Sequence, residues 1–258
     1  MSEDILIAQD GGIVTVTFNR PGKRNAVRLA MWRALERAFV DLRDDAAIRA
    51  VILTGSGEHF CAGADISEFG EVRSDVGSGR VYEAATEAAT IAIRDFPRPT
   101  IAAVSGFGVG GGCGLALACD FRVGDRTTRM GIPAARLGIV YSPLDCGLLH
   151  RQVGLASAKR VLFSGRYFPA DECLRMGLLD TLADVALEGA RDLAAEFVGG
   201  APLSLKGSKV ILEALDANAV VERRAEIDGL IDGAMASEDF REGSRAFLEK
   251  RAPVFSGR

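Results

Sequence analysis

The chain has 258 residues, of which 48% are hydrophobic, so it is long enough to bury a sizeable core in one large domain. Its 31 basic and 35 acidic side chains leave a formal net charge of −4, without a long block of one sign. This balance argues against nucleic acid or a membrane surface as a partner. The composition therefore indicates an ordinary globular protein.

Cysteine and histidine usage predicts neither disulfides nor a metal centre. The five cysteines contain no Cys-x-x-Cys pair and lie in mostly apolar surroundings, which is typical of reduced thiols and predicts a cytoplasmic location. The only two histidines are His59 and His150, so no metal site is expected. The acidic start Met1-Ser2-Glu3-Asp4 does not resemble an export signal, and the longest apolar stretch is too short to span a bilayer.

In chain order, the first half of the sequence predicts strands that alternate with helices. The predicted strands cover residues 5–8, 13–18, 50–55, 100–104 and 121–123, and the first two form a hairpin around Asp10-Gly11-Gly12. Apolar residues recur at helical spacing from Val27 to Leu42. Alternation of this kind favours an α/β fold.

The segment 67–79 combines acidic residues with three glycines, so we expect it to be mobile, a candidate lid before a helix at 80–95. The last third of the chain is predicted to be helical. Its helix-like segments cover residues 144–153, 156–163, 170–176, 186–198, 203–214, 220–235 and 237–250. Such a region packs on the core or on a neighbouring subunit.

Two segments rich in glycine and alanine form the candidate site. The first is Phe60-Cys61-Ala62-Gly63-Ala64-Asp65-Ile66, and the second runs from Gly106 to Gly114, directly into the helix former Leu115-Ala116-Leu117-Ala118. Small residues let the main chain approach a ligand, and the first N–H groups of a helix have no partner within it. The two segments therefore predict a site for an oxyanion, which suits acyl or enolate chemistry.

The order of these motifs resembles that of the crotonase superfamily, also called the enoyl-CoA hydratase/isomerase family, over essentially the whole chain. The other matching segments are Asn19-Arg20-Pro21, Asn25-Ala26, Pro133, Leu137-Gly138 and Phe247-Leu248-Glu249-Lys250-Arg251. The resemblance implies an α/β fold with a crotonase-like ββα spiral core at residues 1–195, which binds acyl-CoA. It also implies a helical region at 196–258 that forms a homotrimer, often a dimer of trimers.

The resemblance further implies an acyl-CoA thioester as substrate, with coenzyme A as part of that substrate and no prosthetic group. The backbone N–H groups of Ala64 and Gly111 would form the oxyanion hole around the thioester carbonyl. Five residues would border the coenzyme A nucleotide, namely Arg24, Ala26, Ala62, Asp65 and Ile66. Phe247 and Lys250 match the part that reaches a coenzyme A on an adjacent subunit; a packed aromatic and a solvated lysine are the alternative.

The sequence departs from the hydratases of this family at the two glutamates that serve as general acid and base. Their positions align with Gly114 and Ala134. Hydration by that pair is therefore not expected, unless another carboxylate such as Glu68, Glu71 or Asp145 replaces it.

Tyr141 is the remaining candidate for catalysis, because its place resembles that of a tyrosine in methylmalonyl-CoA decarboxylase, although that member has a histidine where this chain has Ala64. Equally, Tyr141 can be a wall residue of the pocket. We expect Asp145 to be a helix N-cap, His150 to lie on an apolar helix face, and Cys113 to be a small buried residue. Asp120 is expected to be a structural cap or hydrogen-bond anchor.

The leading hypothesis is an enzyme that stabilises a thioester enolate and is isomerase- or decarboxylase-like rather than a two-glutamate hydratase. The alternative is a non-catalytic acyl-CoA-binding or assembly protein, which Gly114 and Ala134 would also suit. RNA binding finds little support in the acidic charge balance.

Overall fold

The computed structural model describes residues 3–258, so Met1 and Ser2 of the predicted N-terminal start lie outside the described residues. Its strands are β1 (Ile5–Asp10), β2 (Ile13–Phe18), β3 (Ala50–Gly55), β4 (Thr100–Val104), β5 (Phe107–Val109), β6 (Phe121–Gly124), β7 (Arg129–Gly131), β8 (Phe168–Pro169) and β9 (Thr181–Leu182). Its longer helices are α1 (Leu29–Leu42), α3 (Val76–Arg94), α4 (Gly111–Ala118), α6 (Pro143–Ser164), α7 (Ala170–Met176), α8 (Ala186–Val198), α9 (Pro202–Asp216), α10 (Arg224–Ala236) and α11 (Glu238–Glu249). The short elements are η1 (Pro21–Lys23), η2 (Ile66–Glu68), α2 (Phe69–Val72) and α5 (Ala134–Leu137).

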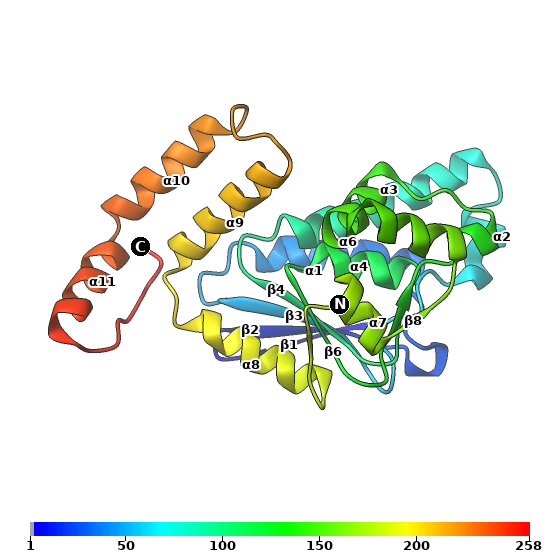
Figure 1. The fold of residues 1–258 in the computed structure, drawn as a ribbon, viewed down its shortest axis with the longest axis horizontal. Helices are drawn as coiled ribbons and strands as arrows, with labels where there is room; N and C mark the ends of the chain where they lie inside the picture. The colour runs from blue at the N-terminus through cyan, green and yellow to red at the C-terminus, as the bar shows by residue number, and fades with distance from the viewer. Residues whose placement is uncertain (1–2) are drawn as a thin grey trace.

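The main sheet has the strand order β1-β2-β3-β4-β6-β9, and β5, β7 and β8 form a smaller sheet (Figure 1). Strands β1 and β2 pair antiparallel, which confirms the predicted hairpin. The other pairs of the main sheet are parallel. The predicted α/β class is therefore confirmed.

Strand β3 shows why the middle of the sheet is apolar at every position. Val51 and Leu53 pack into the large core with α1 and α3, whereas Ala50 and Ile52 face the opposite cluster beneath α8. Successive side chains of a strand point to opposite faces, so a strand covered on both sides buries all of them. On α8, alanines at every fourth position face this second cluster.

Helix α3 begins at Val76, four residues before the predicted start at Arg80. The Asp75 side chain accepts a hydrogen bond from Ser78 N at 2.9 Å, and Asp75 N donates to Ser78 Oγ at 3.1 Å. This capping box stabilises a first turn that contains Gly77 and Gly79, which the propensities alone disfavour. Much of the segment that we expected to be mobile is therefore helical, in η2, α2 and the start of α3.

The two helices predicted at 144–153 and 156–163 form one element, α6, with a kink at Gly154, where φ is 74°. Helices α9, α10 and α11 extend from the body as an arm (Figure 1). The proposed division between residues 195 and 196 falls within the last turn of α8 and stays a prediction. Within residues 3–258, no helix is long and apolar enough to cross a membrane.

Asn25 joins two loops that lead into the first glycine segment. Its side chain is fully buried, and its backbone has a φ of 57°. Oδ1 accepts from Arg20 N at 2.9 Å, while Nδ2 donates to the carbonyl oxygens of Ser56 at 2.9 Å and His59 at 2.6 Å. One side chain thereby satisfies three backbone groups.

Replacing Asn25 with alanine is expected to lower the free energy of unfolding by about 3 kcal/mol or more, because three backbone groups lose their partner. Asn218→Ala is the matched control: Asn218 has a φ of 53°, but its side chain is exposed and makes no described hydrogen bond. Urea unfolding of both variants measures the difference. If both variants lose the same free energy of unfolding, the positive φ of the backbone, and not the loss of hydrogen bonds, would be the cause.

Candidate active site

Two backbone N–H groups without acceptors form the centre of the site. The N–H of Val27 donates to Gly63 O at 2.8 Å and that of Asp65 donates to Val27 O at 2.9 Å, yet the intervening N–H of Ala64 has no acceptor in the described chain. The N–H of Gly111, the first residue of α4, has none either. A β-carbon added at Gly111 would lie 3.8 Å from Ala64 N, so the two donors are close.

Close contact between the two glycine segments holds these donors together. Cys61 and Gly108 form a parallel β-bridge, in which Cys61 N donates to Phe107 O at 2.7 Å and Val109 N donates to Cys61 O at 3.0 Å. At Gly63, where φ is +89°, a β-carbon would lie 2.7 Å from Val109 O and 3.2 Å from Gly111 N. A side chain there would push the segments apart, so glycine is required.

Trp32 and Tyr82 pack next to the Gly111 donor. The sequence did not predict this contact. A β-carbon at Gly111 would lie 3.0 Å from Cη2 of Trp32. The indole Nε1 donates to Tyr82 Oη at 2.8 Å, and both side chains are buried. Burial raises the pKa of Tyr82 to about 12, so its hydroxyl stays protonated. Trp32 is the only tryptophan, but its helical spacing indicated no more than a core position.

Tyr141 lies beside the two donors, as expected for a residue that could take part in catalysis. Its hydroxyl would be 3.6 Å from a β-carbon at Gly110, and it makes no hydrogen bond to any described residue. Burial raises the pKa of Tyr141, and the nearby Cys113 and Asp145 add to this effect. Tyr141 is therefore a neutral hydroxyl that is free to interact with a ligand.

The three carboxylates named from the sequence have different surroundings. Glu68 Oε2 accepts from Leu29 N at 3.0 Å and so caps α1, and Glu71 is exposed. Asp145 is not the N-cap that we expected: Ser142 caps α6 by accepting from Asp145 N at 3.2 Å, because the helix already begins at Pro143. Oδ1 of Asp145 would lie 3.3 Å from a β-carbon at Gly114.

The five residues predicted to border coenzyme A lie along one rim of the site. Arg24 is exposed, with its guanidinium 5.4 Å from the centre of the Phe107 ring, and its carbonyl accepts from Ala62 N at 2.9 Å. The side chain of Arg20 links Ala26 to Asp65, since Nη1 donates to Ala26 O at 2.6 Å and to Asp65 Oδ2 at 2.9 Å.

Asp65 and Ile66 differ in what they offer to a ligand. Burial alone would raise the pKa of Asp65, but hydrogen bonds from Ser67 and Arg20 lower it overall, so the carboxylate is ionised and engaged within the protein. The Ile66 side chain is 62% exposed and available to a ligand. The Asp65 side chain thus chiefly holds the backbone of this segment in place through its contacts with Arg20 and Ser67.

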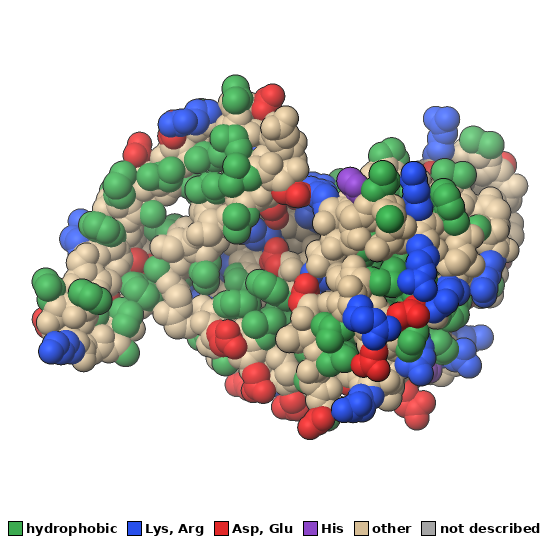
Figure 2. Space-filling model, in the orientation of Figure 1, with side chains coloured by type: hydrophobic (Ala, Val, Ile, Leu, Met, Phe, Trp, Pro, Cys, Tyr) green, Lys and Arg blue, Asp and Glu red, His purple; other side chains and the backbone are tan. Residues whose placement is uncertain are grey.

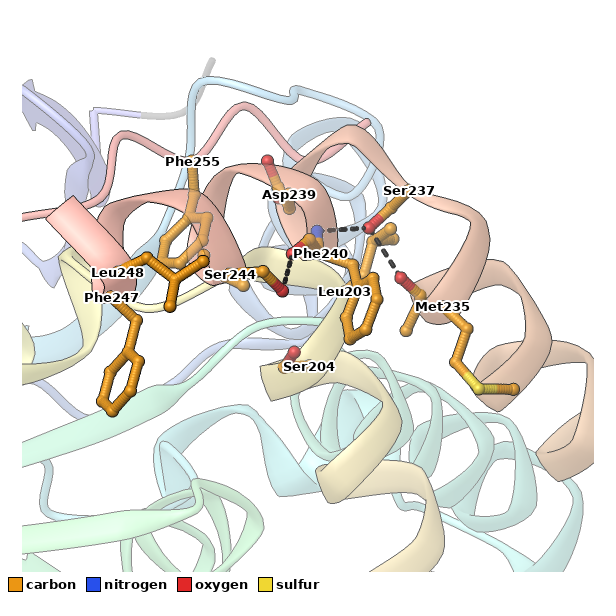
Figure 3. Close-up of a pocket in the computed structure, with 13 residues that line it drawn as sticks. Leu203, Ser204, Met235, Ser237, Asp239, Phe240, Ser244, Phe247, Leu248 and Phe255 are labelled. Carbon is orange, nitrogen blue, oxygen red and sulfur yellow. Dashed lines mark hydrogen bonds between the residues drawn. The ribbon is translucent and has the colours of Figure 1, made fainter.

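Phe247 and Lys250 are not brought together with Ala64 within one chain, because α11 lies at the end of the arm (Figure 1). Phe247 is 83% exposed and lines a cavity of about 630 Å³ with residues of α9 and α10 (Figure 3). Hydrophobic side chains also gather on the face of the arm that Figure 2 shows. The exposed large hydrophobic residues of α9, α10 and the loop between them are Leu212, Leu215, Val221, Ile231 and Met235.

Two of the remaining expectations are confirmed and one is wrong. Asp120 is a hydrogen-bond anchor, since Oδ2 accepts from Thr100 N at 2.8 Å and from Lys209 Nζ at 2.9 Å. Cys113 is fully buried, and burial raises the pKa of its thiol to about 12. His150 is exposed rather than on an apolar face, because Leu148 and Leu149 take the buried positions of that turn. No group of His, Cys, Asp or Glu between residues 3 and 258 is arranged to hold a metal ion.

Comparison with known proteins shows the family of this chain. A model of the enoyl-CoA hydratase/isomerase family matches residues 8–258. The chain is 36% identical to the carnitinyl-CoA dehydratase of Salmonella typhi over 268 aligned positions, which cover 100% of both proteins. It is 32% identical to the short-chain-enoyl-CoA hydratase of Clostridium acetobutylicum, over 96% of this chain and 95% of that relative.

Solved structures agree in fold. The crystal structure of an enoyl-CoA hydratase/carnithine racemase from Magnetospirillum magneticum superposes with a TM-score of 0.94 at 34% identity, covering 100% of this chain and 97% of the other. This match confirms the crotonase-like α/β fold. The full-length family match, the two relatives and this structure lead to one conclusion: the chain belongs to the enoyl-CoA hydratase/isomerase family, whose members process acyl-CoA thioesters.

Proposed function

We propose that this protein is an acyl-CoA enzyme that forms a thioester enolate and then moves a proton or loses carbon dioxide, rather than a hydratase that uses two glutamates. The pair of free N–H groups on Ala64 and Gly111 carries this proposal. Both would donate to the thioester oxygen, and donors arranged in advance around a developing oxyanion stabilise it most in the transition state.

The choice of reaction follows from the side chains around this pair. Addition of water to a double bond needs a positioned proton donor and a positioned acceptor. Gly114 and Ala134 supply neither, whereas Tyr141 presents a free neutral hydroxyl beside Gly110. A reaction that relies on enolate stabilisation suits this set of side chains better than hydration does.

Coenzyme A would lie along the rim formed by Arg24, Ala26, Ala62, Asp65 and Ile66. The exposed guanidinium of Arg24 is available for a phosphate of the nucleotide. Phe247 and Lys250 would reach the coenzyme A of an adjacent subunit, since both lie on the arm. The protein would then act as a homotrimer or a dimer of trimers, with no prosthetic group and in the cytoplasm.

The first prediction from the proposed function tests the Gly111 donor with two variants. Gly111→Ala adds a β-carbon near Trp32 but keeps the N–H, whereas Gly111→Pro adds the same β-carbon and removes the N–H at a helix position that tolerates proline. We expect kcat for the proline variant to be lower than for the alanine variant by roughly 10²- to 10³-fold. Steady-state rates measure this, with thermal unfolding to verify the fold, and equal rates would contradict the assignment.

The second prediction concerns Tyr141. Tyr141→Phe should leave stability nearly unchanged, because the hydroxyl makes no hydrogen bond in the described structure. If that hydroxyl serves the proton transfer, we expect kcat to fall by roughly 10²-fold. Rates on malonyl-type and enoyl-type CoA thioesters identify which reaction depends on it. An unchanged rate on every active substrate would remove Tyr141 from the mechanism.

The third prediction concerns assembly. Phe240→Asp combined with Leu248→Asp places two charges among the exposed apolar residues of the arm and should yield monomers at micromolar concentration. Arg241→Asp, on the same helix but outside that cavity, is the control and should keep the native oligomer. Sedimentation velocity distinguishes the two states. A monomeric unmodified protein would refute the proposed trimer.

A panel of enoyl, β-hydroxyacyl and malonyl thioesters distinguishes the enzyme from a binding protein. Exchange of α-protons for deuterium on any of them supports the proposed function. Tight binding of coenzyme A thioesters without exchange or turnover would favour a non-catalytic acyl-CoA-binding or assembly protein instead.

A further inference from the structure

A second cavity, of about 700 Å³, lies between the body and the arm. Figure 2 shows a hollow between these two parts, in which basic and acidic side chains are visible. The walls are the loop after α1, the end of α3 with the residues that follow it, α9, the start of α10 and Ser256–Gly257. Seven cationic side chains and four carboxylates line the cavity, so its walls carry a net positive charge.

This cavity lies at the edge of the main sheet opposite the candidate active site. Arg49 comes directly before β3, and Arg98 lies two residues before β4. The two glycine segments instead follow the carboxyl ends of these strands, which are parallel. A ligand in the cavity would therefore not occupy the site at Ala64 and Gly111.

Three of the seven cations already have a carboxylate partner. These pairs are Arg94–Asp95 at 2.6 Å, Lys209–Asp120 at 2.9 Å and Arg223–Glu226 at 2.9 Å. The other four, Arg43, Arg49, Arg98 and Lys206, form no ion pair with any described residue. The wall thus holds more cations without an ion-pair partner than the two remaining carboxylates, Asp44 and Glu213, can neutralise.

Arg49 and Arg98 are each held by a backbone carbonyl and keep further donors unused. Nη2 of Arg49 donates to Phe255 O at 3.0 Å, and Nη1 of Arg98 donates to Arg43 O at 2.5 Å. Nη1 of Arg49 is buried and has no hydrogen-bond partner within residues 3–258. These carbonyl contacts fix the two side chains in place without neutralising their charge.

The surroundings of Arg98 disfavour its positive charge. Burial lowers the pKa of Arg98 and the nearby guanidinium of Arg49 lowers it further, whereas Asp45 and Asp44 act in the opposite direction. An anion beside the two guanidinium groups would offset this repulsion. Arginine also binds oxyanions with two parallel N–H···O hydrogen bonds, which favours this type of ligand.

We propose that this cavity binds the phosphate group of a small molecule, held by Arg49 and Arg98 of the body and by Lys206 of α9. A phosphate suits the cavity better than a carboxylate, because its larger charge and additional oxygens match several cations on different walls. The volume is within the range of pockets that hold small organic ligands, so free phosphate and a phosphate ester both fit. The proposal does not depend on the proposed function.

Glu213 of α9 is the lining carboxylate that would oppose such a ligand. Burial raises its pKa, Lys209 opposes this, Asp120 and Asp95 raise it further, and Arg223 lowers it. A charged Glu213 would repel phosphate. Removal of this charge should therefore tighten binding, whereas removal of the cations should weaken it.

The test is isothermal titration calorimetry of the full-length protein at constant ionic strength, with inorganic phosphate and, separately, with adenosine monophosphate. We expect Arg49→Gln combined with Arg98→Gln to raise the Kd of both probes by roughly tenfold or more, because charged donors are lost. Glu213→Gln should lower both Kd values. Tighter binding of adenosine monophosphate identifies an ester as the ligand, and tighter binding of inorganic phosphate identifies the free ion.

Arg24→Gln is the control, because Arg24 belongs to the proposed coenzyme A rim. It should leave both Kd values within about twofold. If the double variant does not fold, Lys206→Gln takes its place, since Lys206 is exposed and should raise the Kd without a cost to the core.

Three results would overturn the proposal. They are no binding of either probe by the unmodified protein at about 10 mM, unchanged affinity in the cavity variants, and loss of binding in Arg24→Gln alone. None of them depends on a rate with a thioester, so the proposed function is tested separately.

Discussion

The site depends on one constraint, which is that two backbone N–H groups stay unpaired and adjacent. A backbone donor without a partner is costly to the extent that it is removed from water, and Ala64 and Gly111 are both partly buried, so the surrounding structure has to hold them in place. The β-bridge between Cys61 and Gly108 and the packing of Trp32 under Gly111 hold the two segments in place. A substrate oxyanion would accept a hydrogen bond from both donors, which relates their lack of partners within the chain to the proposed chemistry.

This constraint also explains where the side chains with reactive groups lie. Helix α4 is buried along almost its whole length, with small and apolar residues that fit between the sheet and α6. It supplies the donor at Gly111 but no acid or base. The loop before α6 supplies Tyr141, whose hydroxyl lies near Gly110, and the first turn of α6 supplies Asp145, which lies near Gly114. The two donors of the candidate site thus come from the first glycine segment and from α4, and its side chains come from the segment that leads into α6.

The arm of α9 to α11 has a different character from the body. Among the described residues, the two buried hydrophobic clusters contain none from the arm, and the arm exposes several large hydrophobic residues, Phe247 among them. Exposed apolar residues of this kind are typical of protein–protein interfaces, and this is the observation behind the proposed trimer. A partner at this surface would bring Phe247 and Lys250 to a neighbouring site, which the proposed trimer requires.

Local sequence was sufficient for many elements and for the centre of the site. The bounds of β2, β3, β4, α7 and α8 agree with their predicted ranges, because the apolar pattern and the flanking turn residues define them locally. The glycine segments predicted a close approach of two backbone segments, and the structure brings them together; that this place binds an oxyanion stays a prediction. The order of the motifs predicted the family.

Other features depended on contacts that the sequence does not display. The start of α3 needed the Asp75 capping box, and the N-cap of α6 is Ser142 rather than Asp145, because the helix begins earlier than its apolar pattern. The contact of Trp32 with Tyr82 joins residues 50 positions apart. The approach of Asp145 to Gly114 likewise joins two helices. The sequence by itself determined the two glycine segments of the proposed oxyanion site, and only the tertiary structure decided which side chains surround them, because the packing of distant segments sets those distances.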